Sequence, residues 1–210
     1  MQTLWYIVDP MCSWCWGFSP IIETIREIYK NQLQIELIVG GLRAGTTEPL
    51  HPSKRSEILQ HWQNVQHRTN QPFKFENALP EGFVYDTEPA CRALVTAATI
   101  DSARIFALLH TIQNAFYAEQ LDVTRTEILS QLAVNVGIQP ERFIATYNSD
   151  TLKLKTQQQF QQAMQWGVSG FPSLVYLKNN APNFLMRGYC DLHELQTRIT
   201  TVLQCEALKI

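Results

Sequence analysis

The chain has 210 residues, of which 45% are hydrophobic and 17% charged, and its formal net charge is −2. This length suits one domain, or one domain with a large insertion, and the composition excludes a disordered or collagen-like chain. The sequence has no basic run and no apolar run near the roughly 18 residues of a membrane span, so we expect no nucleic-acid or membrane partner. The N-terminus lacks the features of a secretion signal, so we expect a cytoplasmic protein.

A strand, a helix and a second strand are predicted within the first forty residues. Residues 4–8 form an apolar run that ends at Asp9-Pro10, isoleucines recur at helical spacing over residues 21–28, and residues 33–39 form a β-branched run before Gly40-Gly41. This order indicates a right-handed βαβ unit with parallel strands.

The middle of the chain reads as helical. Residues 53–67, 89–100, 103–117, 124–136 and 151–166 all fit a period of 3.6 residues better than an alternation. Thr124 and Glu127 have the spacing of a capping box, and Asp86-Thr87 precedes Pro89, which suits a first helical turn. The glutamine-rich stretch 157–165 keeps an apolar stripe through Phe160, Ala163 and Met164, so we expect a helix with one solvated face.

The C-terminal region returns to strands. Residues 173–177 and 184–187 are predicted strands, and the turn-rich segment 178–183 between them favours an antiparallel hairpin, followed by a helix over 192–203. The order is therefore βαβ, a helical insert, then ββα. We expect one α/β domain from residues 1–44 and 168–210, and a helical insertion domain over residues 45–167.

The most informative motif is Cys12-Ser13-Trp14-Cys15, which lies where the first strand meets the first helix. A cysteine at a helix N-terminus faces unpaired backbone N–H groups and the positive end of the helix dipole, and both favour the thiolate. A second cysteine one turn further on can attack a mixed disulfide on the first and release the substrate. The motif therefore indicates two-electron thiol–disulfide chemistry.

Two other interpretations of the cysteine pair stay open. The pair could be half of a zinc site, but Cys91, Cys190 and Cys205 stand alone and no histidine pair has ligand spacing, so we expect no metal. The two cysteines could also be buried and inert, although a strand-to-helix junction tends to expose a thiol.

A second motif, Gly-Val-Ser-Gly-Phe-Pro-Ser, spans residues 167–173 and opens the third predicted strand. Proline is tolerated at the first position of a strand because it need not donate to the ladder there. If the bond between Phe171 and Pro172 is cis, the backbone of Phe171 is turned outward, where it can pair with an extended substrate. We therefore expect a substrate platform formed by Phe171 and Pro172.

Together these motifs resemble the thioredoxin fold. The strand-Cys12-x-x-Cys15-helix pattern, Pro20 and the Val-Ser-Gly-Phe-Pro172 stretch carry that resemblance, and the helical insertion is similar to that of the DsbA group. The segments DPMCSWCWGF (9–18) and DTEPACR (86–92) resemble the cytoplasmic FrnE-like predicted disulfide isomerases within that group.

The resemblance implies a function and site residues. Cys12 would be the nucleophile, Cys15 the resolving thiol and Pro172 the cis-proline opposite them, while Ser13, Trp14 and Phe171 would contact substrate. The substrates would be protein or small-molecule thiols and disulfides. No bound cofactor is implied, but glutathione would be a possible co-substrate, and glutathione or a thioredoxin-type protein a possible reductant.

The chain departs from the family pattern in two ways. Thioredoxin and DsbA carry a buried carboxylate six residues before the first cysteine, where this chain has Tyr6, so proton transfer at Cys15 would use water or Asp9. The dipeptide between the cysteines is Ser-Trp and lacks the cationic histidine of DsbA. We therefore expect a less oxidising couple.

The remaining candidates have simpler explanations. Trp5 and Phe18 are expected in the core, and Cys91 and Cys205 are expected to be buried within helices and inert. Cys190 follows the last strand and is a candidate third reactive thiol. The glycines from Gly40 lack the lysine of a nucleotide-binding loop, and His51, His61 and His67 have no paired spacing; we interpret the glycines as a strand end and the histidines as ordinary surface or core residues.

Two other function classes remain as alternatives. The first is a glutathione-dependent transferase or isomerase, since the kappa-class transferases and hydroxychromene-carboxylate isomerases share this architecture but have serine where Cys12 stands. The second is a non-catalytic binding module that docks partners on the helical insert. Retention of both cysteines favours the disulfide oxidoreductase.

Overall fold

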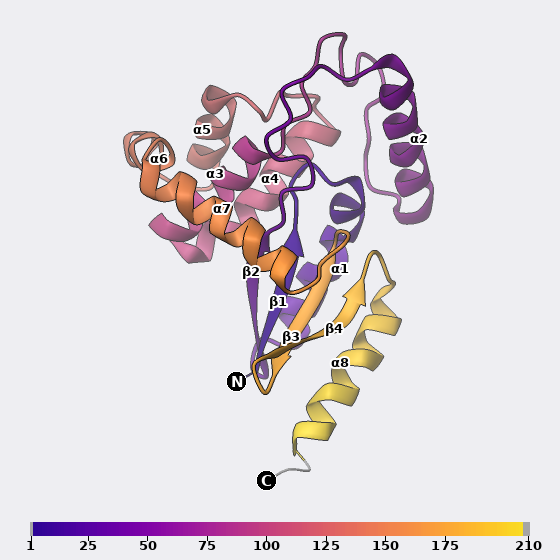
Figure 1. Cartoon of the computed structure of the whole chain (residues 1–210). Helices are drawn as coiled ribbons and strands as arrows, with labels where there is room; N and C mark the ends of the chain where they lie inside the picture. The colour runs from indigo at the N-terminus through magenta and orange to yellow at the C-terminus, as the bar shows by residue number, and fades with distance from the viewer. Residues whose placement is uncertain (1, 208–210) are drawn as a thin grey trace.

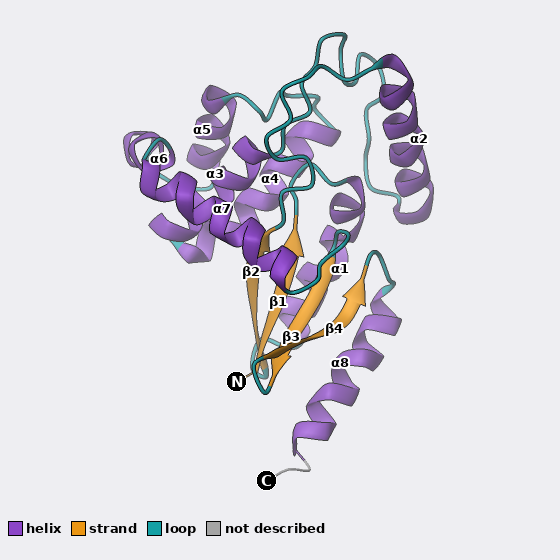
Figure 2. Ribbon diagram, viewed as in Figure 1, coloured by secondary structure: helices purple, strands orange, loops and turns teal. Residues whose placement is uncertain are grey.

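Four strands form one mixed sheet at the centre of the molecule (Figure 1, Figure 2). The computed structural model describes residues 2–207. The sheet order is β2-β1-β3-β4, in which β1 and β2 run parallel while β3 is antiparallel to both β1 and β4. The strands are β1 (Gln2–Val8), β2 (Leu33–Val39), β3 (Ser173–Lys178) and β4 (Ala181–Arg187). The predicted βαβ unit and C-terminal hairpin are confirmed.

Helices flank the sheet and fill the long connection between β2 and β3. They are α1 (Ser13–Ile28), α2 (Pro52–Thr69), α3 (Glu88–Ile100), a 3-10 turn (Ser102–Arg104), α4 (Ile105–Tyr117), α5 (Thr126–Asn135), α6 (Pro140–Tyr147), α7 (Asp150–Gln165) and α8 (Leu192–Ala207). Within residues 2–207, no helix has the length and apolar character that crossing a bilayer would require.

Side chains of β1 alternate between two hydrophobic clusters, as the period of a strand dictates. Tyr6 and its i±2 neighbours face the main cluster, which includes buried residues of α1 and α8, whereas Ile7 faces a smaller cluster with Ala163 of α7. Trp5 packs against this smaller cluster, half-buried and 5.7 Å from Trp166 between ring centroids, so it lies at the edge of the core that was expected to hold it. Phe18 is fully buried, as expected.

The main cluster continues from the sheet into the helical insert. The ring of Tyr6 stacks on Phe106 of α4 at 6.4 Å, and Leu94 of α3 belongs to the same cluster. The expected division of the chain into one domain of residues 1–44 plus 168–210 and a helical insertion domain of residues 45–167 stays a prediction.

Two helix predictions in the insert are wrong. The structure adds α6, which begins at Pro140 and buries only Phe143 and Tyr147, too few apolar positions for a period to be recognised. The capping box at Thr124 does not form, because its hydroxyl donates to Asp122 at 2.6 Å and α5 starts two residues later. Pro89 does lie in the first turn of its helix.

The C-terminal hairpin is tighter than predicted. Asn179 and Asn180 form the turn with φ values of 53° and 62°, and asparagine tolerates this left-handed region. The strands therefore extend to Lys178 and back from Ala181, and Pro182 is accommodated because β4 is an edge strand. The expected apolar stripe of α7 fails at Met164, which is 66% exposed.

Candidate active site around Cys12

Cys12 is the N-cap residue of α1. Its carbonyl accepts hydrogen bonds from the backbone N–H groups of Cys15 at 3.0 Å and Trp16 at 3.1 Å, which start the helix. The first turn of α1 itself carries no acidic residue that would offset the positive end of the helix dipole. Cys12 is 6% exposed and Cys15 is 0% exposed, and both are free thiols. Cys12 is therefore the sulfur of the pair that a substrate can reach.

The substrate platform predicted at Phe171 and Pro172 lies against the Cys12 thiol, although Phe171 is 159 residues from Cys12 in the sequence. The Phe171–Pro172 peptide bond is cis, and the carbonyl of Phe171 accepts a hydrogen bond from the Cys12 thiol at 3.6 Å. The Pro172 carbonyl is occupied by the backbone N–H of Gly188 at 2.8 Å, which ties the platform to the end of β4. The structure thus brings together the two motifs that the sequence singled out.

The ring of Phe171 is seated against the backbone of Gly40 at the end of β2. A Cβ atom built on Gly40 would lie 1.9 Å from Cε1 of that ring, which no real structure tolerates. Phe160 of α7 similarly covers Gly41, whose φ is +68°. The two glycines therefore do more than end a strand, because they make room for aromatic rings beside the site.

A cavity of about 230 Å³ opens beside Cys12. The predicted contact residues Ser13, Trp14 and Phe171 line it. Its other walls come from the segment before α1, from the loop after β2, from α2 and from the segment before α3: Met11, Leu42, Arg43, Ile58, His61, Trp62 and Tyr85. The cavity gives a short group of a substrate access to the Cys12 sulfur.

Trp14 also forms part of an aromatic rim beside the cysteine loop. Its ring lies 5.4 Å from that of Tyr189, which follows β4, and the guanidinium of Arg68 on α2 lies 5.7 Å from the Tyr189 ring centroid. Trp14 is half-buried. The rim extends the surface that a larger substrate would meet.

The buried thiol of Cys15 strongly prefers its protonated form. Burial raises the pKa of Cys15 well above its ordinary value, and the hydrogen bond with Cys12 and the charge on Cys12 raise it further. A thiol attacks as the thiolate, so Cys15 must lose its proton before it can act as a nucleophile.

Tyr6 is unsuited to accept that proton. Its hydroxyl is buried without a hydrogen-bond partner among the described residues, and burial raises the pKa of Tyr6 well above its ordinary value. A phenol in such a site stays neutral and is not a base at neutral pH. The position that holds a carboxylate in thioredoxin and DsbA therefore contributes packing here.

Asp9 supplies a buried carboxylate from a different position. It is 0% exposed, and its Oδ1 accepts from the Met11 N–H at 2.8 Å while its Oδ2 accepts from the Leu42 N–H at 2.7 Å. The carbonyl of Asp9 also accepts from the Cys12 N–H at 3.1 Å. Asp9 thus joins the cysteine loop to the loop that follows β2.

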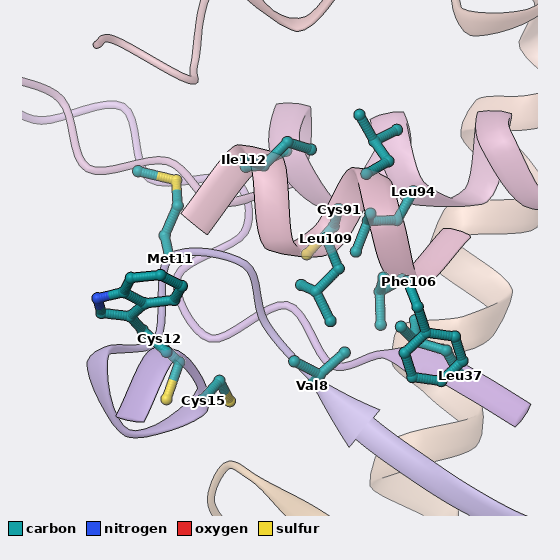
Figure 3. Close-up of a cluster of buried hydrophobic side chains, with 14 of the residues drawn as sticks. Val8, Met11, Cys12, Cys15, Leu37, Cys91, Leu94, Phe106, Leu109 and Ile112 are labelled. Atoms are coloured by element: carbon teal, nitrogen blue, oxygen red, sulfur yellow. The ribbon is translucent and has the colours of Figure 1, made fainter. Parts of the chain in front are cut away.

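Cys91 shares this carboxylate. The Cys91 thiol donates to Asp9 Oδ2 at 3.5 Å from the first turn of α3, and Figure 3 shows it within the buried cluster behind the cysteine loop. Burial raises the pKa of Cys91 well above its ordinary value, and the negative charge of Asp9 adds to that effect. Burial likewise raises the pKa of Asp9, although its hydrogen bonds to Thr87, Met11 and Leu42 oppose the change.

These observations can be set against known proteins. A family model described as a DsbA-like thioredoxin domain matches residues 4–200. The chain belongs to this DsbA-like family. The predicted fold class, a thioredoxin fold with a DsbA-like helical insertion, is thereby confirmed, whereas the FrnE-like subgroup stays a prediction.

Solved structures agree with this DsbA-like assignment. The crystal structure of "a putative protein disulfide isomerase from Nitrosomonas europaea" is 47% identical in sequence, with a TM-score of 0.93 over 97% of this chain and 98% of that one. The cytosolic disulfide reductase DsbM from Pseudomonas aeruginosa, also solved with GSH, shares the fold with a TM-score of 0.78 over 97% of this chain and 99% of that one, at 24% identity.

Curated sequence relatives are more distant. The ClpXP adapter protein SpxH of Shouchella clausii is 20% identical over 185 residues, which cover 85% of this chain and 58% of that protein. The DsbA-like chain therefore spans little more than half the length of this relative.

The other candidate residues lie apart from the Cys12 cavity. Cys190 is 7% exposed, and burial raises the pKa of its thiol to about 11, which disfavours a third reactive thiolate at neutral pH. Cys205 lies in α8, but its side chain falls outside the part that the structure describes. Among the described residues, no group of three or more potential ligands could hold a metal ion.

Two of the histidines singled out in the sequence have different places in the structure. His51 caps α2 by accepting from the Ser53 N–H at 3.4 Å, and His61 lines the Cys12 cavity, which its spacing in the sequence did not indicate. A larger cavity of about 670 Å³ lies between β2, α7 and the start of α4, but its lining contains no cysteine.

Sequence reasoning missed Arg43, His61 and Tyr85 as lining residues, and it missed the Asp9–Cys91 contact. No local motif marks any of them, because they meet only when the loop after β2 and the start of α3 fold onto the cysteine loop.

Proposed function

We propose that this DsbA-like chain is a thiol–disulfide oxidoreductase, acting as a reductase or isomerase, with Cys12 as nucleophile and Cys15 as resolving thiol. The observation that carries the proposal is the position of Cys12. Its sulfur lies at the N-terminus of α1, opens onto a cavity and faces the Phe171 carbonyl at 3.6 Å, while Cys15 is fully buried one turn behind it.

The proposed reaction moves two electrons in two steps. The Cys12 thiolate attacks a substrate disulfide, so a mixed disulfide forms and one substrate thiolate leaves. Cys15, once deprotonated, attacks the Cys12 sulfur, which closes the Cys12–Cys15 disulfide and releases the second substrate thiolate. The substrate gains two electrons and the protein dithiol is oxidised. The reverse sequence oxidises a dithiol substrate.

Asp9 is the proposed proton acceptor for Cys15. Asp9 is a fully buried carboxylate beside the cysteine pair, and its negative charge is among the causes that raise the pKa of Cys15. Because burial also raises the pKa of Asp9, this carboxylate is a stronger base than an exposed aspartate and is better matched to a thiol proton. Tyr6 does not compete for this role.

The proposed partners are protein or small thiols and disulfides, with glutathione as reductant or co-substrate. The names of the neighbours support this choice, because one is a cytosolic disulfide reductase solved with GSH. The Ser13-Trp14 dipeptide, which carries no cation between the cysteines, supports a couple less oxidising than DsbA.

A stoichiometric assay tests the two-cysteine mechanism. Pre-reduced wild type, mixed with oxidised glutathione in the absence of other thiols, should release two glutathione molecules per chain. Cys15→Ser should release one and keep the other as a mixed disulfide on Cys12, measured by thiol titration and intact mass. Cys190→Ser is the matched control and should behave as wild type.

Other outcomes would select other functions. Release of two glutathione molecules by Cys15→Ser would contradict the resolving role. No reaction with any disulfide, together with glutathione conjugation that survives in Cys15→Ser, would favour the transferase or isomerase alternative. A chain inert in both assays that still binds partners would favour a binding module.

A further inference from the structure

The cavity beside Cys12 is lined by basic side chains and by no carboxylate. Arg43 and His61 line it, and no aspartate or glutamate is among its lining residues. Glu57, on the same helix as His61, is exposed and already pairs with Lys54 at 2.8 Å and with His61 at 3.8 Å. The site that admits a substrate sulfur is therefore also a site for a negative group.

The guanidinium of Arg43 has no polar partner among the described residues. Among the described residues, no carboxylate lies within 4.0 Å of it and it donates no hydrogen bond; its guanidinium carbon lies 5.3 Å from the centroid of the Tyr85 ring. Other arginines of the chain are used structurally, as in Arg92, which pairs with Glu88 at 2.8 Å. Arg43 is half-buried, so its five N–H donors lie at the cavity without a protein acceptor.

The backbone around Arg43 holds this side chain in place relative to Cys12. The Arg43 N–H donates to the Thr87 hydroxyl at 3.1 Å, and the adjacent Leu42 N–H donates to Asp9, which also binds the cysteine loop. These bonds do not involve the guanidinium. Replacing the Arg43 side chain should therefore remove its charge while leaving the loop intact.

We propose that Arg43 is a specificity-determining residue that binds a carboxylate of the thiol or disulfide substrate, so that the site prefers small acidic disulfides. The proposal rests on the proposed function. An unpaired guanidinium matches a carboxylate in shape and charge and can bind it through two parallel hydrogen bonds. The cavity of about 230 Å³ lies below the roughly 300–1,000 Å³ of typical ligand pockets, so it suits a small disulfide.

Single-turnover kinetics with three disulfides of different charge test the proposal. The pre-reduced protein is mixed with anionic oxidised glutathione, neutral hydroxyethyl disulfide or cationic cystamine, and oxidation of the Cys12–Cys15 pair is followed by tryptophan fluorescence. Arg43→Gln should lower the second-order rate constant for oxidised glutathione about tenfold. The same variant should change the constant for hydroxyethyl disulfide less than about twofold and should raise that for cystamine.

Three controls separate recognition from other effects. Arg43→Lys keeps the charge but loses the bidentate geometry and should recover part of the preference. Arg142→Gln removes an equal charge from exposed α6 and should leave all three rate constants as in wild type. Raising the salt concentration should weaken the wild-type preference for oxidised glutathione over hydroxyethyl disulfide.

The outcomes distinguish this inference from the proposed function beneath it. Equal losses with all three disulfides in Arg43→Gln would overturn the inference, because Arg43 would then act on the Cys12 thiol. No loss with oxidised glutathione would also overturn it. Failure of the wild type to react with any disulfide would instead remove the proposed function, and the inference with it.

Discussion

Cys12 and Cys91 both lie in or beside the first turn of a helix, yet their surroundings differ in access and in charge. Cys12 opens onto a cavity that is lined by Arg43 and by no carboxylate. Cys91 is fully buried and donates its thiol to the Asp9 carboxylate at 3.5 Å. Burial and the charge of Asp9 raise the pKa of Cys91 well above its ordinary value.

The comparison shows that a helix N-terminus alone does not make a reactive thiol. The helix dipole acts over about one turn and contributes at most a kcal/mol or two, which burial beside a negative charge easily exceeds. Cys12 combines the helix end with access from a cavity, whereas Cys91 has a helix end without access and with the Asp9 carboxylate against its thiol. Burial likewise keeps Cys15 protonated, which is why the proposed mechanism needs a base such as Asp9.

Alkylation should show the largest contrast between the two thiols. In the native, reduced protein at neutral pH, we expect iodoacetamide to modify Cys12 at least about a hundredfold faster than Cys91, because Cys12 opens onto a cavity whereas Cys91 is fully buried and its pKa is raised. Peptide mass spectrometry of time points measures both rates. Modification of Cys91 at a rate comparable to that of Cys12, without unfolding, would break the comparison.

Asp9→Asn tests the base proposed for Cys15. We expect the resolving step, followed as the lifetime of the mixed disulfide on Cys12, to slow about a hundredfold, because general-base assistance is lost. The initial attack by Cys12 should change less than about threefold.

Asp86→Asn is the matched control for that variant. Asp86 anchors the same loop by accepting from the Gly45 N–H at 2.8 Å and the Glu88 N–H at 3.0 Å, but it does not contact the cysteine pair. If Asp86→Asn slows the resolving step as much as Asp9→Asn, Asp9 acts by positioning the loop and is not the base.

Asp9 should also give the stability of the protein a specific pH dependence. Burial raises the folded-state pKa of Asp9 above its unfolded value of about 3.9, so the protonated carboxyl is the form that folding favours. Its stabilising contribution is fully present below about pH 4 and is lost as the pH rises through the raised pKa.

Urea unfolding of wild type and Asp9→Asn across pH measures this contribution. The free energy of unfolding of wild type minus that of the variant should fall as the pH rises. A difference that stays flat or increases over that range would show that the pKa of Asp9 is not raised.

Gly40→Ala should have a smaller effect on the chemistry and a measurable effect on stability. The new Cβ would meet the Phe171 ring at 1.9 Å, so the ring and the carbonyl that faces Cys12 must move. We expect a loss of about 1–3 kcal/mol in the free energy of unfolding from overpacking and about a tenfold slower disulfide exchange. Gly170→Ala is the control, because its Cβ meets nothing within 4 Å. Equal effects of the two variants would contradict the seat proposed for Phe171.

The sequence predicted most of the sheet and of the helices that flank it because their periods are strong. The continuous apolar run over residues 4–8 marks β1, and the isoleucines of α1 recur at helical spacing. Helix α6 escaped prediction because only Phe143 and Tyr147 are buried in it. The turn of the hairpin was predicted too long, because two asparagines alone complete it.

The site could be predicted in part. Cys12 and the Phe171-Pro172 segment carry local motifs, and the structure places them in contact. Asp9 could be named only as an alternative to water and Arg43 not at all, because their roles depend on tertiary contacts between segments around residues 9, 42 and 91. A single sequence holds no signal for how three such segments meet.

A redox titration of the Cys12–Cys15 pair tests the central claim most directly. Wild-type protein is equilibrated in glutathione buffers of stepped ratio and followed by tryptophan fluorescence and by trapping of free thiols. We predict one reversible two-electron transition, with a midpoint between about −270 mV, as for thioredoxin, and about −180 mV, as for protein disulfide isomerase. The absence of any Cys12–Cys15 disulfide across the whole series would contradict the account.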